Sequence, residues 1–152
     1  MISNNKNAYG TNYAKNNNIK FKIINSKKMI NFESKTLIIL KKNNIKLICL
    51  AGFMKVLSDK FIKDFKYKIL NIHPSLLPKY KGLNTHKRVL KNKEKFSGCT
   101  VHYVTNKLDS GRIILQKKVK IIKADNEKTL RKKILKIEHL IYPKAIKLAL
   151  KN

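Results

Sequence analysis

The stretch YKILNIHPSLLP, residues 67–78, decides the fold. Residues 67–72 form a largely apolar segment that predicts a buried strand, and Pro74 and Pro78 restrict the loop that follows. Upstream, residues 46–53 (KLICLAGF) are a continuous apolar run, which is typical of a strand buried on both faces in a parallel sheet. Between these two strands, Ser58 can cap a helix that runs to about Phe65. The order strand, helix, strand predicts an α/β protein.

The same alternation extends in both directions along the chain. Strands are expected at 19–25, 98–105 and 112–122, with a turn at 106–111, and helices at 33–44, 86–92 and from Asp125 or Asn126 to Leu150. The last helix has apolar residues at steps of three and four, namely Leu130, Ile134, Ile137, Ile141, Ala145 and Leu148. Pro143 should kink it.

The charge of the chain is strongly positive, at +28, from 36 Lys and Arg against 8 acidic residues. Nucleic-acid surfaces are usually rich in Arg, whereas Arg occurs here only at Arg88, Arg112 and Arg131. Lys is spread along the chain, and Asn and Ile are also abundant, as an AT-rich coding sequence would produce. We therefore expect no specific nucleic-acid partner, although the charge should attract anionic substrates.

Composition also limits the cellular setting. No apolar run approaches the ~18 residues of a membrane span, and the polar, Asn-rich residues 1–10 are unlike a signal peptide. Cys49 and Cys99, each in an apolar stretch, are too few for a disulfide scaffold, so a reducing cytoplasm is expected. No Cys/His cluster has the spacing of a zinc site.

Candidate chemistry lies at the end of the 67–72 strand, because ligands of α/β sheets bind beyond the carboxyl ends of the strands. Residues two apart on a strand point to the same side, so Asn71 and His73 can face one site. An amide can donate to an oxyanion, and an imidazole can move a proton. The plainer alternative is a His that satisfies a loop carbonyl. Asp109 follows the 98–105 strand and is either a catalytic carboxylate or an ordinary turn residue.

Several ordered motifs form a specific resemblance. Residues 50–57 (LAGFMKVL), 71–78 (NIHPSLLP) and 102–111 (HYVTNKLDSG) resemble the formyltransferase family in sequence and order. The loop 79–86 (KYKGLNTH) and residues 138–143 (EHLIYP) resemble its glycinamide ribonucleotide branch.

This resemblance implies a doubly wound, mostly parallel sheet with helices on both faces, in a single domain over residues 1–152. It implies transfer of a formyl group from 10-formyltetrahydrofolate to the amine of glycinamide ribonucleotide, a step of purine biosynthesis, without a metal and by a monomer or homodimer. Asn71 would stabilise the formyl oxygen, His73 would move protons or assist as a cation, and Asp109 would hold a water and raise the pKa of His73.

The resemblance also implies the binding residues. Those expected to contact the folate are Met54, Lys55, Val56, Leu57, Asn71 and Thr105. Those expected to contact the nucleotide are Ile72, Pro74 and Glu138. His102 and His139 are interpreted as ordinary strand and helix residues.

Two departures from the family pattern stand out. Residues 1–4 resemble the end of the family's second strand, so its first strand, Gly-rich phosphate loop and helix are missing. A misplaced start is the favoured explanation, and a decaying gene is the alternative. The neighbours of that strand should then have unpaired edges. In addition, Lys28 and Met29 lie where the family has a folate-contacting Arg.

Three alternatives remain open. A formyltetrahydrofolate deformylase would use water as the acceptor, but it has a different loop after the His and a further regulatory domain. A methionyl-tRNA formyltransferase would suit the charge but needs a tRNA-binding domain. A non-catalytic, basic nucleic-acid-binding relic of the enzyme would have no need of Asn71, His73 and Asp109 together.

Overall fold

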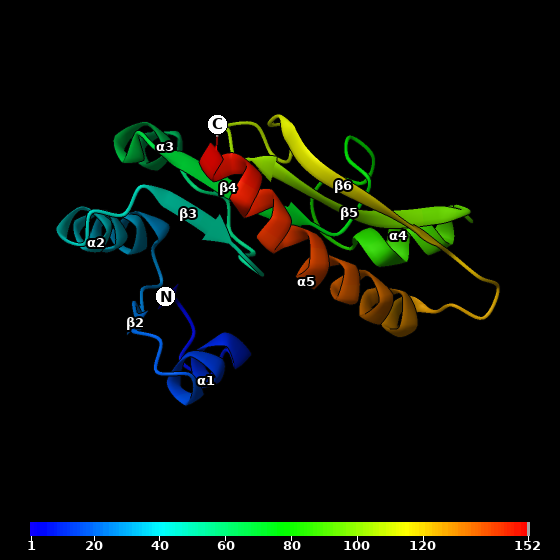
Figure 1. Cartoon of the computed structure of the whole chain (residues 1–152), viewed down its shortest axis with the longest axis horizontal. Coiled ribbons are helices and arrows are strands. Elements are labelled where there is room, and N and C mark those ends of the chain that lie inside the picture. Colours follow the sequence, from blue (N-terminus) through cyan, green and yellow to red (C-terminus); the bar gives the residue numbers. More distant parts are fainter. Residues whose placement is uncertain (152) are drawn as a thin grey trace. The chain divides into compact units, whose positions relative to one another are not determined.

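The computed structural model describes residues 1–151 and divides into two compact units. The first unit contains Met1–Lys46 and Leu57–Lys66, and the second contains Leu47–Val56 and Tyr67–Asn152 (Figure 1). The expectation of one domain over the whole chain stays a prediction. Within the described residues, no helix is both long and apolar enough to cross a membrane.

The first unit combines a small parallel sheet with three helices. Strands β1 (Ile2–Ser3) and β2 (Lys22–Ile23) pair in parallel. Helix α1 (Tyr9–Asn16), which the polar sequence did not reveal, lies between them in the chain. Helix α2 (Met29–Lys42) begins four residues before the predicted start at 33, and β2 is shorter than the predicted strand.

Helix α3 (Asp59–Phe65) is joined to α2 by a buried carboxylate. The Ser58 hydroxyl accepts a hydrogen bond from the N–H of Phe61 at 3.1 Å, so the predicted cap is confirmed. Glu33 of α2 accepts from both the N–H and the hydroxyl of Ser58, each at 2.7 Å. Two helices are therefore connected through one serine.

The second unit contains a four-stranded sheet in the order β3-β4-β5-β6. The strands are β3 (Leu47–Leu50), β4 (Lys68–His73), β5 (Phe96–Tyr103) and β6 (Ile113–Lys120). The α/β fold class is confirmed, but the sheet is mixed and not mostly parallel, because only β3 and β4 pair in parallel there. The short connection between β5 and β6 returns the chain directly, which allows only an antiparallel pair.

Strand β3 is less buried than its apolar sequence predicted. Leu47, Ile48 and Leu50 are half-buried and Cys49 is exposed, so the prediction of burial on both faces is wrong. In the part of the chain that the structure describes, β3 pairs only with β4 and lies at the edge of the sheet. The expected unpaired edge is therefore present.

Helices α4 (Thr85–Lys91) and α5 (Glu127–Lys151) supply the core of the second unit. They pack against Cys99 and Val101 of β5, in a cluster completed by Val89, Leu130, Ile134, Ile141 and Ala145. Helix α5 continues through Pro143, and its last turns bury Ala149 while the predicted Leu148 is exposed.

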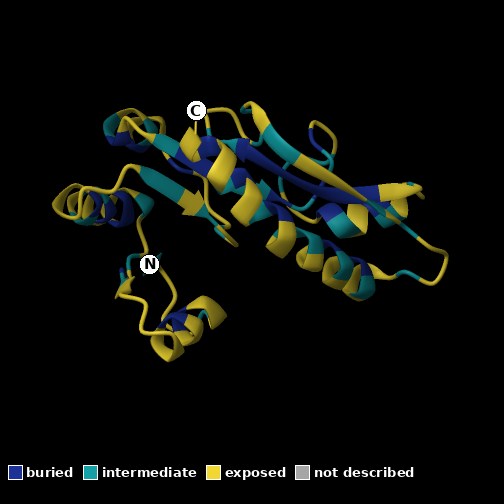
Figure 2. Cartoon of the chain, viewed as in Figure 1, coloured by how far each residue is buried: buried dark blue, intermediate teal, exposed yellow. Residues whose placement is uncertain are grey.

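Strand β5 is buried on its other face as well, as Figure 2 shows. There the loop that follows β4 covers it: the Thr100 hydroxyl donates to the Ser75 carbonyl at 2.6 Å and accepts from the Leu77 N–H at 3.1 Å. Gln116 of β6 donates to the same hydroxyl at 2.8 Å. This face of the sheet carries the polar side chains discussed next.

Candidate active site

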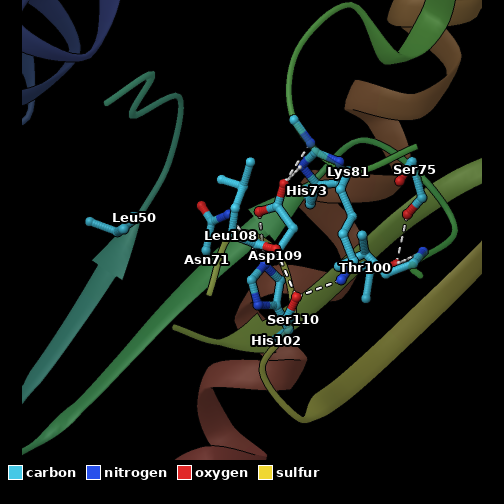
Figure 3. A network of polar contacts seen from close by, with 12 residues as sticks. Leu50, Asn71, His73, Ser75, Lys81, Thr100, His102, Leu108, Asp109 and Ser110 are labelled. Carbon is cyan, nitrogen blue, oxygen red and sulfur yellow. Dashed lines mark hydrogen bonds and ion pairs between the residues drawn. The ribbon is translucent and has the colours of Figure 1, made fainter. Parts of the chain in front are cut away.

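Asn71 and His73 lie at the end of β4 on the face of the sheet that carries Thr100. Across the antiparallel ladder, Asn71 is opposite His102 and His73 is opposite Thr100. Opposite residues in a ladder point to the same face, so the four side chains lie together (Figure 3). The predicted sharing of one site by Asn71 and His73 agrees with this register.

His73 is buried and has a contact at each ring nitrogen. Nε2 lies 2.9 Å from the carbonyl oxygen of Tyr80 and therefore donates to it. Nδ1 lies 3.4 Å from Oδ2 of Asp109. The loop-carbonyl contact of the plainer alternative thus exists, but it occupies only one of the two nitrogens.

The pKa of His73 is lowered, because burial of the ring outweighs every other influence. The Tyr80 carbonyl and the charge of Asp109 act in the opposite direction. The expected effect of Asp109 on this pKa therefore has the predicted direction, but it is smaller than the opposing effect of burial.

Asp109 occupies a left-handed backbone conformation, with φ of 45°. Its Oδ2 accepts from the N–H of Gly82 at 2.8 Å, and its Oδ1 lies 3.6 Å from Nε2 of His102. Burial would raise the pKa of Asp109, but the hydrogen bonds from His102 and Gly82 and the charge of His73 lower it overall. The carboxylate is therefore held by other segments of the chain, and not by its own turn alone.

Two glycines make this arrangement possible. Gly82, which belongs to the loop 79–86, has φ of 76°, a conformation that favours glycine. At Gly111, just after Asp109, a Cβ would collide with the carbonyl oxygen of Tyr103. Gly82 thus allows the loop 79–86 to donate to Asp109, and Gly111 allows the Asp109 turn to pack closely against the end of β5.

His102 belongs to the site, although the sequence alone predicts an ordinary strand residue at this position. Its Nε2 lies 3.3 Å from Nδ2 of Asn71, and its Nδ1 lies 2.9 Å from the carbonyl oxygen of Tyr103. The alternation of β5 places His102 and Thr100 on one face, but only the register with β4 reveals that this face is the site.

The predicted folate contacts are spread over both units. Met54, Lys55 and Val56 are exposed in the second unit, and Leu57 is buried in the first. Thr105 is exposed in the turn after β5, where its hydroxyl contacts the backbone of Lys107 at 3.3 Å.

The predicted nucleotide contacts also differ in their surroundings. Ile72 packs against the core cluster under α5, and its side chain points away from the site face. Pro74 is half-buried at the start of the loop. Glu138 is half-buried on α5, where burial raises its pKa against the opposing charges of His139 and Arg131.

The chemistry of the cluster follows from its groups. It combines an amide N–H₂, an imidazole with a lowered pKa and a carboxylate held by a backbone N–H. Such a set can stabilise a developing oxyanion and move a proton beside it.

Comparison with known proteins identifies the family to which a chain with this site belongs. The sequence model of the formyl transferase family matches residues 1–146. The chain is 42% identical to the phosphoribosylglycinamide formyltransferase of Haemophilus influenzae over 150 residues, covering 97% of this chain and 71% of that protein. It is 39% identical over 151 residues to the human trifunctional purine biosynthetic protein adenosine-3, of which it spans 15%.

The fold comparison agrees with the sequence comparison. The crystal structure of phosphoribosylglycinamide formyltransferase from Anaplasma phagocytophilum matches with a TM-score of 0.91 and 41% identity, covering 97% of this chain and 71% of that one. The protein is a member of the formyl transferase family.

Proposed function

We propose that this chain transfers the formyl group of 10-formyltetrahydrofolate to the amine of glycinamide ribonucleotide, a step of purine biosynthesis. The observation that carries the proposal is the placement of Asn71, His73 and Asp109 on one face at the end of β4. The names of the Haemophilus and Anaplasma relatives support the same reaction.

In the proposed reaction, the amine nitrogen attacks the formyl carbon and the formyl oxygen becomes negatively charged. The Nδ2 group of Asn71 donates a hydrogen bond to this oxygen. The lowered pKa of His73 leaves it unprotonated near neutral pH, as a base requires. His73 takes the proton of the amine and returns it to N10 of the folate as the bond between that nitrogen and the carbon breaks.

Asp109 assists by electrostatics. Its lowered pKa keeps it ionised, so it stabilises His73 whenever that ring is protonated. The carboxylate lies 3.4 Å from Nδ1 of His73 and 3.6 Å from Nε2 of His102, which is too close for a water between them, so the water expected at Asp109 would bind beside these contacts.

The binding residues of the proposal follow the family pattern. Residues 54–57 and Thr105 would contact the folate. The strand end at Ile72 and Pro74, together with Glu138, would contact the nucleotide. The positive charge of the chain, +28, suits a ribonucleotide phosphate. We further propose that the enzyme acts in the cytoplasm on these small molecules, as a monomer or homodimer and without a metal.

The test is an assay of formyl transfer from 10-formyltetrahydrofolate to glycinamide ribonucleotide, with His73→Ala as the control. Turnover that disappears in the variant supports the proposal. The same assay is run on a second protein, in which an N-terminal strand–loop–helix unit from the Haemophilus relative is fused to the start of this chain. If neither protein transfers formyl to the nucleotide, or if both only release formate to water, the proposed acceptor is wrong.

A further inference from the structure

The hydroxyl group of Tyr142 joins helix α5 to the ends of two strands. Its oxygen lies 2.7 Å from the carbonyl oxygen of Leu50 and 3.2 Å from that of Leu70. A tyrosine hydroxyl has a single proton, and the shorter contact identifies Leu50 as its principal acceptor. The proposed reaction, as described above, gives this side chain no role.

Both carbonyls belong to backbone that leads directly into the site. Leu50 is the last residue of β3 and pairs in register with Asn71 (Figure 3). Leu70 immediately precedes Asn71 on β4. Immediately after Leu50, the chain enters segment 51–56, which includes Gly52 with φ of 64°. The position of the Leu50 carbonyl therefore sets where this segment starts.

Strand β3 has few other contacts that fix its position, so the hydrogen bond from Tyr142 should matter for it. Within residues 1–151 it is held in the sheet by β4 alone, and its side chains are half-buried or exposed. The ring of Tyr142, in contrast, packs against the buried core cluster of the second unit. Burial also raises the pKa of this hydroxyl, so it remains a donor at neutral and moderately alkaline pH.

We propose that Tyr142 is a positioning residue for folate binding, which acts by fixing the carboxyl end of β3 and with it the start of segment 51–56. This inference rests on the proposed function, because that function assigns residues 54–56 to the folate. It adds a residue of α5, outside the polar cluster, to those on which binding of the folate depends.

The first arm of the test is kinetic and uses Tyr142→Phe, which removes the hydroxyl and keeps the ring. We expect the KM for 10-formyltetrahydrofolate to rise about fivefold, as the loss of one neutral hydrogen bond predicts. The kcat and the KM for the nucleotide should change less than about twofold, since their groups are not touched. Equal changes in both KM values would indicate a general structural role and overturn the proposal.

The second arm does not depend on turnover. Amide hydrogen exchange in β3 should become about fivefold faster in Tyr142→Phe, while exchange in β5 stays unchanged. Unchanged exchange in β3 overturns the anchor even if the enzyme is active. Faster exchange in a protein without formyl transfer supports the anchor and counts against the proposed function instead. Tyr13→Phe, at an exposed position on α1, is the control for removal of a hydroxyl.

A measurement on the unaltered protein covers the case in which the variant does not fold. In mixed H₂O and D₂O, a slowly exchanging hydroxyl proton splits the ζ-carbon NMR signal of its tyrosine. The proposal requires such splitting for Tyr142, and a rapidly averaged single signal would overturn it.

Discussion

Nδ1 of His73 and Oδ2 of Asp109 lie 3.4 Å apart, and each side chain is only 8% exposed. When His73 is neutral and donates from Nε2 to Tyr80, its Nδ1 presents a lone pair to the carboxylate. Two acceptors face each other, and a proton between them would satisfy both. Burial of His73 opposes that protonation and outweighs the attraction of the carboxylate, so the pKa of His73 is lowered on balance.

Replacement of Asp109 by Asn should lower the pKa of His73 further. The carboxylate raises this pKa at present, and without it burial acts with less opposition. NMR titration of the His73 ring would measure the change. Asp64→Asn removes an exposed carboxylate of the first unit that pairs with Lys60, and should leave the titration of His73 unaltered. A midpoint that moves upward in Asp109→Asn would contradict the assigned direction.

Loss of the Asn71 amide should act on the chemical step. In Asn71→Ala we expect kcat to fall by about 10²- to 10³-fold, the usual effect of removing an oxyanion donor. Steady-state kinetics with both substrates would measure it, and Asn17→Ala, on the exposed end of α1, provides the control. A variant that keeps its kcat and loses only substrate affinity would exclude the oxyanion role.

Mild acid should destabilise the protein through two histidines. Burial lowers the pKa of both His73 and His86, so the unfolded state binds more protons just below the ordinary pKa of about 6.5. Their contribution to stability is present above that pH and is lost as the pH falls through the lower, folded values. Urea unfolding between pH 5 and pH 8 would measure it.

The double variant His73→Gln and His86→Gln isolates this contribution, because other groups, such as Glu138 with its raised pKa, cancel in the comparison. The free energy of unfolding should depend less on pH in the double variant than in the original protein. Parallel curves for the two proteins would rule the histidines out as the cause.

Two glycines of the second unit offer a matched pair of stability tests. Gly52→Ala meets no atom within 4 Å, so it should cost only the strain of a positive φ, about 1 kcal/mol. Gly111→Ala forces a Cβ against the Tyr103 carbonyl and should cost about 3 kcal/mol. Chemical denaturation measures the loss in free energy of unfolding for each variant. Equal losses would mean that the Asp109 turn can move to accommodate the added Cβ.

The sequence predicted this site better than it predicted the sheet that carries it. Asn71 and His73 could be placed together because alternation along one strand is a local rule. His102 could not, since its role depends on the register between β4 and β5, which is set by contacts distant in the chain. Likewise, the apolar run of β3 suggested burial on both faces, whereas exposure depends on which strands lie beside it.

The net pKa of His73 shows the same limit at the level of one group. A neighbouring carboxylate can be inferred from a motif, and its direction of action follows from charge. The burial that outweighs it is a property of the folded chain, in which His73 is buried at the end of β4. The balance between the Asp109 charge and the burial of His73 can therefore be judged only from the folded structure.

The division of the chain into its two units limits how the protein can be taken apart. The first unit is discontinuous, since the chain leaves it after Lys46, re-enters at Leu57 and leaves again after Lys66. A stop codon or a single cut after Lys66 therefore leaves β3 of the second unit attached to the first unit, and no single cut separates the two units completely. During synthesis, the first unit stays incomplete until residue 66 has left the ribosome, and by then β3 of the other unit has already emerged. At that stage β4, the strand that pairs with β3 in the sheet, has still to be synthesised.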